Sequence, residues 1–199
     1  MKFNSCILSS LLVLASFSSS AEELLKRQNV GPELNCSNGP AKIKDKSEFN
    51  LLFGDYSEES GTLKIISRNP LKVHVYAEVF AGDPLKVKEH LVKKAIISNI
   101  YQVFTFSDIN KITVTSSVKE INIANGVKAG KLLKSPAYTI TKTRDQALSD
   151  LRKLTNAKSF NDLFIGYYQV CQFSPVFKQF LYDDQGGVGV SQFFNQVKK

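Results

Sequence analysis

The segment from residue 61 to 121 has the pattern strand, helix, strand, which constrains the fold more than any other feature of the chain. Apolar and polar residues alternate from 71 to 80 and again from 111 to 121, the period of half-buried strands. From 84 to 106 apolar residues recur at every third or fourth position, which is typical of an amphipathic helix. Because short connections join these stretches, we predict a βαβ unit with two parallel strands in one sheet. The buried face of its helix is expected to consist of Val92, Ala95, Ile96, Ile100, Val103 and Phe104, with polar residues such as Gln102 mostly opposite.

Signals for turns and helix ends frame this unit. Arg68-Asn69-Pro70 predicts a hairpin between a short strand at 62–67 and the strand at 71–80, and Asp83 is predicted to cap the long helix. A further strand is expected at 137–142, after a loose segment. Three helices are predicted in the C-terminal third, with starts at Thr143, Ser159 and Ser174. The expected fold is α+β, a small mixed sheet that contains the βαβ unit and is followed by helices.

Residues 1–21 have the pattern of a secretory signal. One lysine precedes an apolar run that ends in Ser19-Ser20-Ala21, and this run is shorter than the roughly 20 apolar residues that a membrane-spanning helix needs. We predict cleavage after these small residues and export to the periplasm or the cell exterior. No later segment reaches spanning length without charges, so the mature chain is expected to be soluble. An N-terminal arm is expected at 22–60 and a single α+β domain at 61–199.

Cleavage would leave two of the three cysteines, Cys36 and Cys171. In an oxidising compartment two remaining cysteines most simply form a disulfide, and this bridge would connect the N-terminal arm to the C-terminal region. The alternative is two separate thiols, with Cys171 as a core residue among apolar neighbours. We predict the disulfide.

The sequence contains no motif for catalysis, metal binding or a cofactor. The two histidines, His74 and His90, lie on predicted polar, solvated faces, and neither a nucleophile motif nor a metal-ligand spacing accompanies them. The acidic, glycine-rich segment 183–189 lacks the spacing of a calcium loop or a phosphate-binding loop, so we interpret it as a helix end and a turn. No catalytic residue, metal or cofactor is therefore predicted.

The charge distribution offers one candidate binding surface. The full chain has a formal net charge of +8 at pH 7, and no acidic residue occurs from 121 to 144. This stretch carries the candidate partner-binding cations Lys128, Lys131, Lys134, Lys142 and Arg144. Such a run of one sign can attract an anionic partner; the alternative is a solvated face that only keeps the protein soluble. An acidic protein, an anionic envelope polymer or lipid head groups fit an exported chain, whereas export argues against cellular nucleic acid.

Three functions follow from these features. The first is an exported, non-enzymatic module that binds a macromolecular partner in the envelope or outside the cell. The second is a hydrolase of an extracellular polymer that uses paired carboxylates, for which Glu58-Glu59, Glu78 and Asp183-Asp184 are the candidates. The third is an assembly accessory that offers a sheet edge to a partner strand. They require, respectively, an exposed basic surface, two carboxylates in a cleft and an open edge strand.

Overall fold

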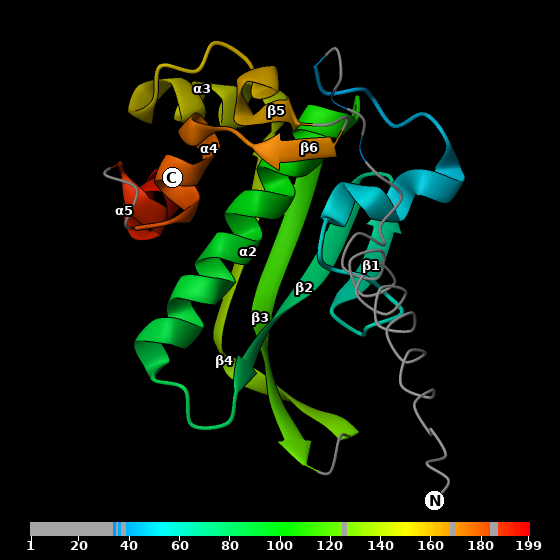
Figure 1. Ribbon diagram of the computed structural model, residues 1–199, viewed down its shortest axis with the longest axis vertical. Coiled ribbons are helices and arrows are strands. Elements are labelled where there is room, and N and C mark those ends of the chain that lie inside the picture. The colour runs from blue at the N-terminus through cyan, green and yellow to red at the C-terminus, as the bar shows by residue number, and fades with distance from the viewer. Residues whose placement is uncertain (1–33, 35, 37–38, 125–126, 168–169, 184–186) are drawn as a thin grey trace, which may run out of the picture. The chain divides into compact units, whose positions relative to one another are not determined.

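The computed structural model describes residues 34, 36, 39–124, 127–167, 170–183 and 187–199 (Figure 1). The predicted signal at 1–21 and the first part of the predicted arm lie outside the described residues. Residues 34–199 belong to one compact unit. The helices and strands follow in the order η1 (Lys46–Phe53), β1 (Leu63–Arg68), β2 (Leu71–Phe80), α2 (Leu85–Phe106), β3 (Lys111–Ala124), β4 (Val127–Thr143), α3 (Arg144–Leu154), η2 (Phe160–Leu163), β5 (Phe164–Tyr167), β6 (Val170–Phe173), α4 (Pro175–Leu181) and α5 (Gly189–Val197), where η marks a 3-10 helix.

Four strands form one mixed sheet in the order β1-β2-β3-β4, and β5 pairs with β6 in a separate hairpin. β1 and β2 are antiparallel and form the predicted hairpin. β2 and β3 run parallel, with Leu71 opposite Ile112 and Phe80 opposite Ile121, and this pair with α2 between its strands confirms the predicted βαβ unit. β4 completes the sheet antiparallel to β3. The fold is therefore α+β, as the sequence predicts.

The core lies between one face of this sheet and α2. The alternate residues of β2 from Leu71 to Val79 are each no more than 3% exposed. They belong to the same apolar cluster as Val92 and Ile96, two of the helix residues predicted to be buried. The apolar face of β2 and the apolar face of α2 thus pack against each other, as the sequence predicts. The sheet that β2 belongs to also contains β3 and β4.

The second half of α2 is enclosed on all sides. From Ala95 to Phe106 every residue except Ser98 is buried, because η1, η2, α4 and α5 contact the helix in addition to the sheet. Gln102, expected on the polar side, is buried and donates from Nε2 to the carbonyl oxygen of Leu51, 3.3 Å away. The prediction of a single buried face is therefore wrong for this half, since other elements cover the face that the sheet leaves open.

The start of α2 also differs from the expectation. The helix begins at Leu85 with Pro84 in the N-cap position and without a side-chain cap. The prediction that Asp83 caps it is wrong, because Asp83 Oδ2 accepts instead from the N–H of Phe80, 2.9 Å away, and so closes the turn after β2. None of residues 85–91 is buried, so α2 begins beyond the core.

Two of the predicted C-terminal helices are present with the predicted caps. At the start of α3 the Thr143 side chain accepts from the Gln146 N–H, and the Gln146 side chain accepts from the Thr143 N–H. This reciprocal capping box satisfies two backbone donors that a helix leaves unpaired. At the start of α4 the Ser174 Oγ accepts from the Phe177 N–H, 3.2 Å away.

The helix expected after Ser159 is wrong. Ser159 precedes only the short η2, and the chain then forms the β5–β6 hairpin, with Phe164 opposite Phe173 and Gly166 opposite Cys171. The rings of Phe164 and Phe173 lie 5.5 Å apart and pack against the core, a cross-strand contact that a helix would separate. α5 is a further element that the sequence pattern did not predict.

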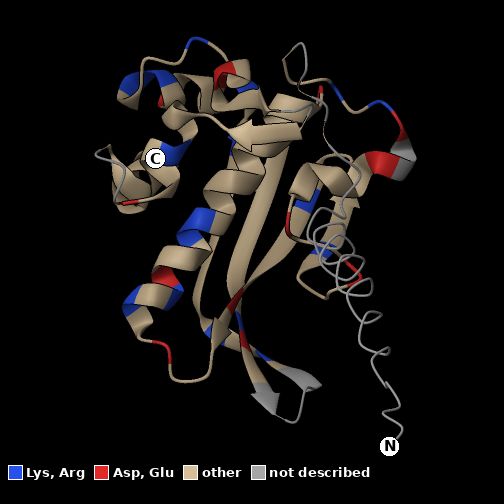
Figure 2. Cartoon of the chain, viewed as in Figure 1, with Lys and Arg blue, Asp and Glu red and all other residues tan. Residues whose placement is uncertain are grey.

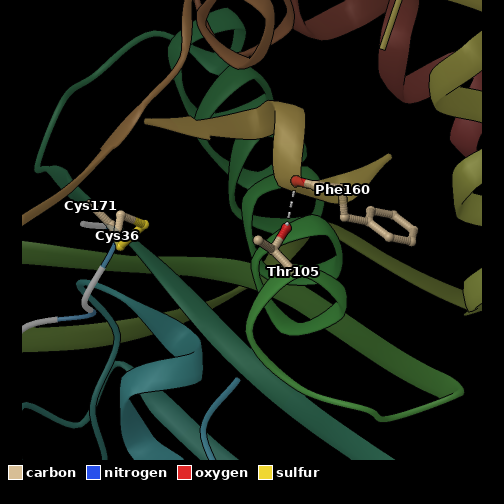
Figure 3. Close-up of a disulfide and its surroundings, with 4 residues drawn as sticks. All are labelled: Cys36, Thr105, Phe160 and Cys171. Carbon is tan, nitrogen blue, oxygen red and sulfur yellow. Dashed lines mark hydrogen bonds between the residues drawn. A yellow bond between two sulfur atoms is a disulfide. The ribbon is translucent and has the colours of Figure 1, made fainter. Parts of the chain in front are cut away.

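Cys36 and Cys171 form the predicted disulfide, with an S–S distance of 2.04 Å (Figure 3). Cys36 is buried, and the Cys171 N–H donates to the carbonyl oxygen of Leu34, 3.2 Å away. Near the bridge, Thr105 of α2 donates to the carbonyl oxygen of Phe160, 3.3 Å away (Figure 3). The disulfide therefore connects the segment before η1 to the C-terminal hairpin, beside the enclosed half of α2.

Candidate partner-binding surface

β3 and β4 continue as a paired extension at the end of the sheet where α2 begins (Figure 1). The sequence predicted a loose segment after residue 122 and a strand only at 137–142, but β4 begins at Val127, which lies opposite Ala124 of β3. The signal that favours this pairing is Asn125-Gly126, a dipeptide common in two-residue hairpins. The stretch that lacks acidic residues is therefore mostly strand.

This extension, together with the start of α2, forms a surface that we call the arm end. It consists of Phe80 at the end of β2, the turn at 81–84, residues 85–91 of α2, residues 119–122 of β3 and residues 130–134 of β4. Two contacts join these segments: the Ala81 N–H donates to the carbonyl oxygen of Ile121, 3.2 Å away, and Lys88 Nζ lies 3.1 Å from Glu120 Oε2. Segments far apart in the sequence thus share one end of the described unit (Figure 1).

The arm end contains more lysines than acidic residues, and both kinds of residue lie on its segments in Figure 2. Three of its lysines are exposed and, within the described residues, form no ion pair: Lys86, Lys131 and Lys134. Lys119 lies 3.2 Å from Glu78, and Glu120, which lies opposite Lys131 in the register, is already bound by a lysine of α2. The side chain of Lys128 lies outside the described residues.

Lys142 lies near the opposite end of β4 and is only 7% exposed. Its Nζ is 2.7 Å from Asp150 Oδ2 of α3, and Asp150 Oδ1 accepts from Gln196 Nε2 of α5, 2.8 Å away. In the register Lys142 lies opposite Ile112, on the face of the sheet that the helices cover. Through Asp150, Lys142 of β4 is connected to both α3 and α5. It contributes no exposed charge to the arm end.

Arg144 closes the C-terminal end of α2. Its Nη1 donates to the carbonyl oxygen of Phe104 (2.6 Å), and its Nη2 donates to those of Ser107 (2.5 Å) and Ile109 (3.1 Å). Lys42 Nζ donates to the Ser107 carbonyl as well, at 2.7 Å. The last carbonyls of a helix lack partners within it and carry partial negative charge, so both cations stabilise this end. Burial lowers the pKa of both groups, and the charge of Arg144 lowers the pKa of Lys42 further.

The substitution Arg144→Met is expected to lower the free energy of unfolding by about 2 kcal/mol, because it leaves partly buried carbonyls without a charged donor. Urea unfolding followed by far-UV circular dichroism measures this loss. Arg152→Met is the matched control, since the Arg152 guanidinium also donates to a carbonyl, that of Lys158, but at an exposed site. This control should cost roughly 0.5 kcal/mol or less. Equal losses in the two variants would contradict the helix-closing role of Arg144.

The sheet face turned away from the helices carries a histidine–serine pair that sequence patterns did not show. His74 Nε2 lies 2.8 Å from Ser117 Oγ, and the imidazole stacks on Tyr76 with ring centroids 4.2 Å apart. Burial lowers the pKa of His74, and the positive charge of Lys64 lowers it further. The expectation that His74 is a solvated surface residue is therefore corrected. Ser117 is buried, and within the described residues no carboxylate contacts the imidazole, so the third group of a catalytic triad is missing.

The carboxylates considered for a hydrolase have exposed or structural settings. Glu58-Glu59 is exposed, and Glu78 forms an ion pair with a lysine of β3. Asp183 Oδ1 accepts from the Val190 N–H at the start of α5, 2.8 Å away, and Asp184 lies outside the described residues. A shallow depression between α3 and α5 is lined by two acidic residues, Asp145 and Asp150, but Lys142 and Gln196 already bind the carboxylate of Asp150. This arrangement gives the hydrolase alternative no support.

No group of three His, Cys, Asp or Glu side chains in the described ranges is placed to hold a metal ion. None of the helices in the part of the chain that the structure describes is long and apolar enough to cross a membrane. The four-stranded sheet ends at β1 and β4, which are the edges that strand addition would use.

Comparison with protein-family models, curated proteins and solved structures gives no match to this chain.

Proposed function

We propose that this protein is an exported, non-catalytic module that binds an anionic macromolecular partner through the arm end. The observation that carries the proposal is the exposed positive charge of that surface, where Lys86, Lys131 and Lys134 form no ion pair within the described residues. Two of these lysines come from the stretch that lacks acidic residues. An acidic protein or an anionic envelope polymer has the complementary charge.

Export is the second part of the proposal. The pattern at 1–21 predicts a cleaved secretory signal. The disulfide between Cys36 and Cys171 supports this prediction, because structural disulfides persist mainly in oxidising compartments outside the cytosol. In the periplasm or outside the cell, an envelope polymer or another exported protein is available as a partner, whereas cellular nucleic acid is not.

The fold supports binding by holding the arm-end lysines on ordered elements. Lys86 belongs to α2, whose second half is enclosed by the core, and Lys131 and Lys134 belong to β4, which pairs with β3. A surface ordered before contact loses little conformational entropy on binding. Because these charges are exposed, salt screens them over a Debye length of about 10 Å at 0.1 M ionic strength. Partner binding should therefore weaken as salt rises.

Reversal of two arm-end charges in Lys131→Glu with Lys134→Glu is expected to weaken binding to immobilised heparin roughly tenfold at 0.1 M salt. Each exposed charge pair contributes up to about 1 kcal/mol, and the variant loses two. The salt concentration at elution and a binding isotherm measure the effect.

The control for this experiment is Lys158→Glu with Lys178→Glu, which produces the same net charge by changing two exposed lysines outside the arm end. A basic protein is retained in part by its net charge, and the control variant measures that share. The proposal expects the control to elute close to the wild type. Equal losses in the two variants would show that net charge, and not the arm end, binds the polyanion.

A further inference from the structure

The arm end also exposes apolar side chains, which a purely electrostatic site does not need. The exposed fractions are 58% for Phe80, 61% for Leu85, 40% for Val87 and 56% for Leu132. These are four of the seven large apolar residues that are exposed in the described part of the chain. Concentrations of exposed apolar side chains on one surface commonly mark contact sites.

The position of these side chains follows from where the core stops. α2 starts beyond the region that η1 and the C-terminal elements enclose, so Leu85 and Val87 lack cover. Phe80 is the last residue of β2 and lies opposite Ile121, and Leu132 belongs to the β3–β4 extension. The end of β2, the start of α2 and the β3–β4 extension lie at the same end of the fold (Figure 1), and the exposed apolar residues belong to these segments.

Lysines are interleaved with these apolar residues along both segments. Lys86 lies between Leu85 and Val87, and Lys131 directly precedes Leu132. On β4 the side chains of Lys131 and Leu132 point to opposite faces of the strand pair, so the two groups flank the end of the extension. At a membrane surface, apolar side chains enter the boundary between head groups and acyl chains, while the long lysine stem lets the ammonium group reach phosphate. A sugar polymer or an acidic peptide would use the lysines but leave the apolar side chains in water. The combination therefore favours lipid over these two partners.

We propose that the arm end docks on an anionic lipid surface, with Phe80, Leu85 and Leu132 in the interface and Lys86 and Lys131 at the lipid phosphates. This inference rests on the proposed function, because it uses the same basic surface, and it assigns a lipid surface as the anionic partner in place of an acidic protein or an envelope polymer. Each lysine that reaches an anionic leaflet increases partitioning about fivefold, and the apolar side chains add an attraction that salt does not screen. Docking should therefore keep a component that survives at high salt.

A single introduced tryptophan tests this contact, because the chain has none of its own. In Leu85→Trp the fluorescence emission is expected to shift to shorter wavelength with vesicles of phosphatidylcholine and phosphatidylglycerol, and not with phosphatidylcholine alone. Ile165→Trp is the matched control, since Ile165 is 47% exposed but lies on β5, outside the arm end. Its emission should not change. An unchanged emission of Leu85→Trp, or equal shifts in both variants, would overturn lipid docking.

The variant Phe80→Ser with Leu85→Ser separates lipid docking from charge binding. Its affinity for the anionic vesicles is expected to fall roughly tenfold, because two half-exposed apolar side chains no longer enter the interface. Its elution from immobilised heparin and its far-UV circular dichroism should remain those of the wild type, since both side chains are exposed. Undiminished vesicle binding would contradict lipid docking but would leave the proposed function intact. By contrast, wild-type heparin binding by Lys131→Glu with Lys134→Glu would contradict the proposed function itself.

Discussion

Removal of the disulfide by Cys36→Ala with Cys171→Ala is expected to lower the free energy of unfolding by about 3–5 kcal/mol. The two cysteines are 135 residues apart in the sequence, and the chain-entropy model gives about 5 kcal/mol for a loop of that length, at the upper end of the usual range. The bridge also holds the segment before η1, where the Ile43 N–H donates to the carbonyl oxygen of Phe106, 2.7 Å away. Urea unfolding of the wild type and the variant at neutral pH measures the loss.

Reduction provides the control for this experiment. Dithiothreitol should destabilise the wild type by about as much as the two substitutions do, and it should leave the alanine variant unchanged. An unchanged urea midpoint in the alanine variant would favour the alternative of two separate thiols at Cys36 and Cys171. It would also remove one support for export, because a persistent disulfide indicates an oxidising compartment.

The substitution Lys142→Met is expected to lower the free energy of unfolding by about 3–5 kcal/mol. It leaves the carboxylate of Asp150, which is 4% exposed, buried without its cation, and an uncompensated buried charge carries a penalty of this size. Lys153, whose Nζ lies 3.7 Å from Asp150 Oδ1, is a more distant and more exposed replacement. Thermal or urea unfolding of the single variant measures the effect.

The double variant Lys142→Met with Asp150→Leu identifies the cause of this loss. Replacing both members of a buried pair by apolar residues is often neutral, so the double variant should recover most of the stability. Additive losses from the two substitutions would contradict a coupled ion pair. Folded Lys142→Met protein should bind heparin like the wild type, because Lys142 is buried outside the arm end. Weaker heparin binding by the folded variant would return Lys142 to the partner-binding surface.

The βαβ unit could be predicted because its local patterns and its tertiary burial agree. The alternation in β2 gives one buried face from Leu71 to Val79, and α2 brings Val92 and Ile96 to the same core. The helix caps at Thr143 and Ser174 could be predicted for the same reason. Each cap side chain accepts a hydrogen bond from a residue only three positions later in the sequence. Contacts of this range are encoded in the spacing of the sequence.

Elements that depend on distant partners could not be predicted in this way. The residues after Ser159 carry a local cap signal, but the pairing of Phe164 with Phe173 decides that β5 and β6 are strands. The enclosure of Gln102 requires η1, which lies far before α2 in the sequence. In both cases tertiary contacts override the local preference.

The candidate site was predictable only in part. The sequence prediction grouped Lys142 with Lys131 and Lys134 by charge alone. The period of the strand, however, places Lys142 on the same buried face as Ile140. Lys131 and Lys134 are exposed, in agreement with a basic surface. The apolar side chains beside them, such as Phe80 and Leu85, could not be assigned to the surface from sequence, because their exposure depends on where the core ends.

The claim that the arm end is the binding surface is tested most directly by mapping a bound anionic ligand onto the backbone amides. We expect that titration of the isotope-labelled protein with a short heparin fragment, followed by nuclear magnetic resonance, shifts the amide signals of the arm end at residues 80–91, 119–122 and 130–134. Signals of α3, α4 and the β5–β6 hairpin should stay unchanged, although α3 and α4 carry the lysines Lys153 and Lys178. Shifts confined to those elements, or spread evenly over all lysines, would contradict a binding surface at the arm end.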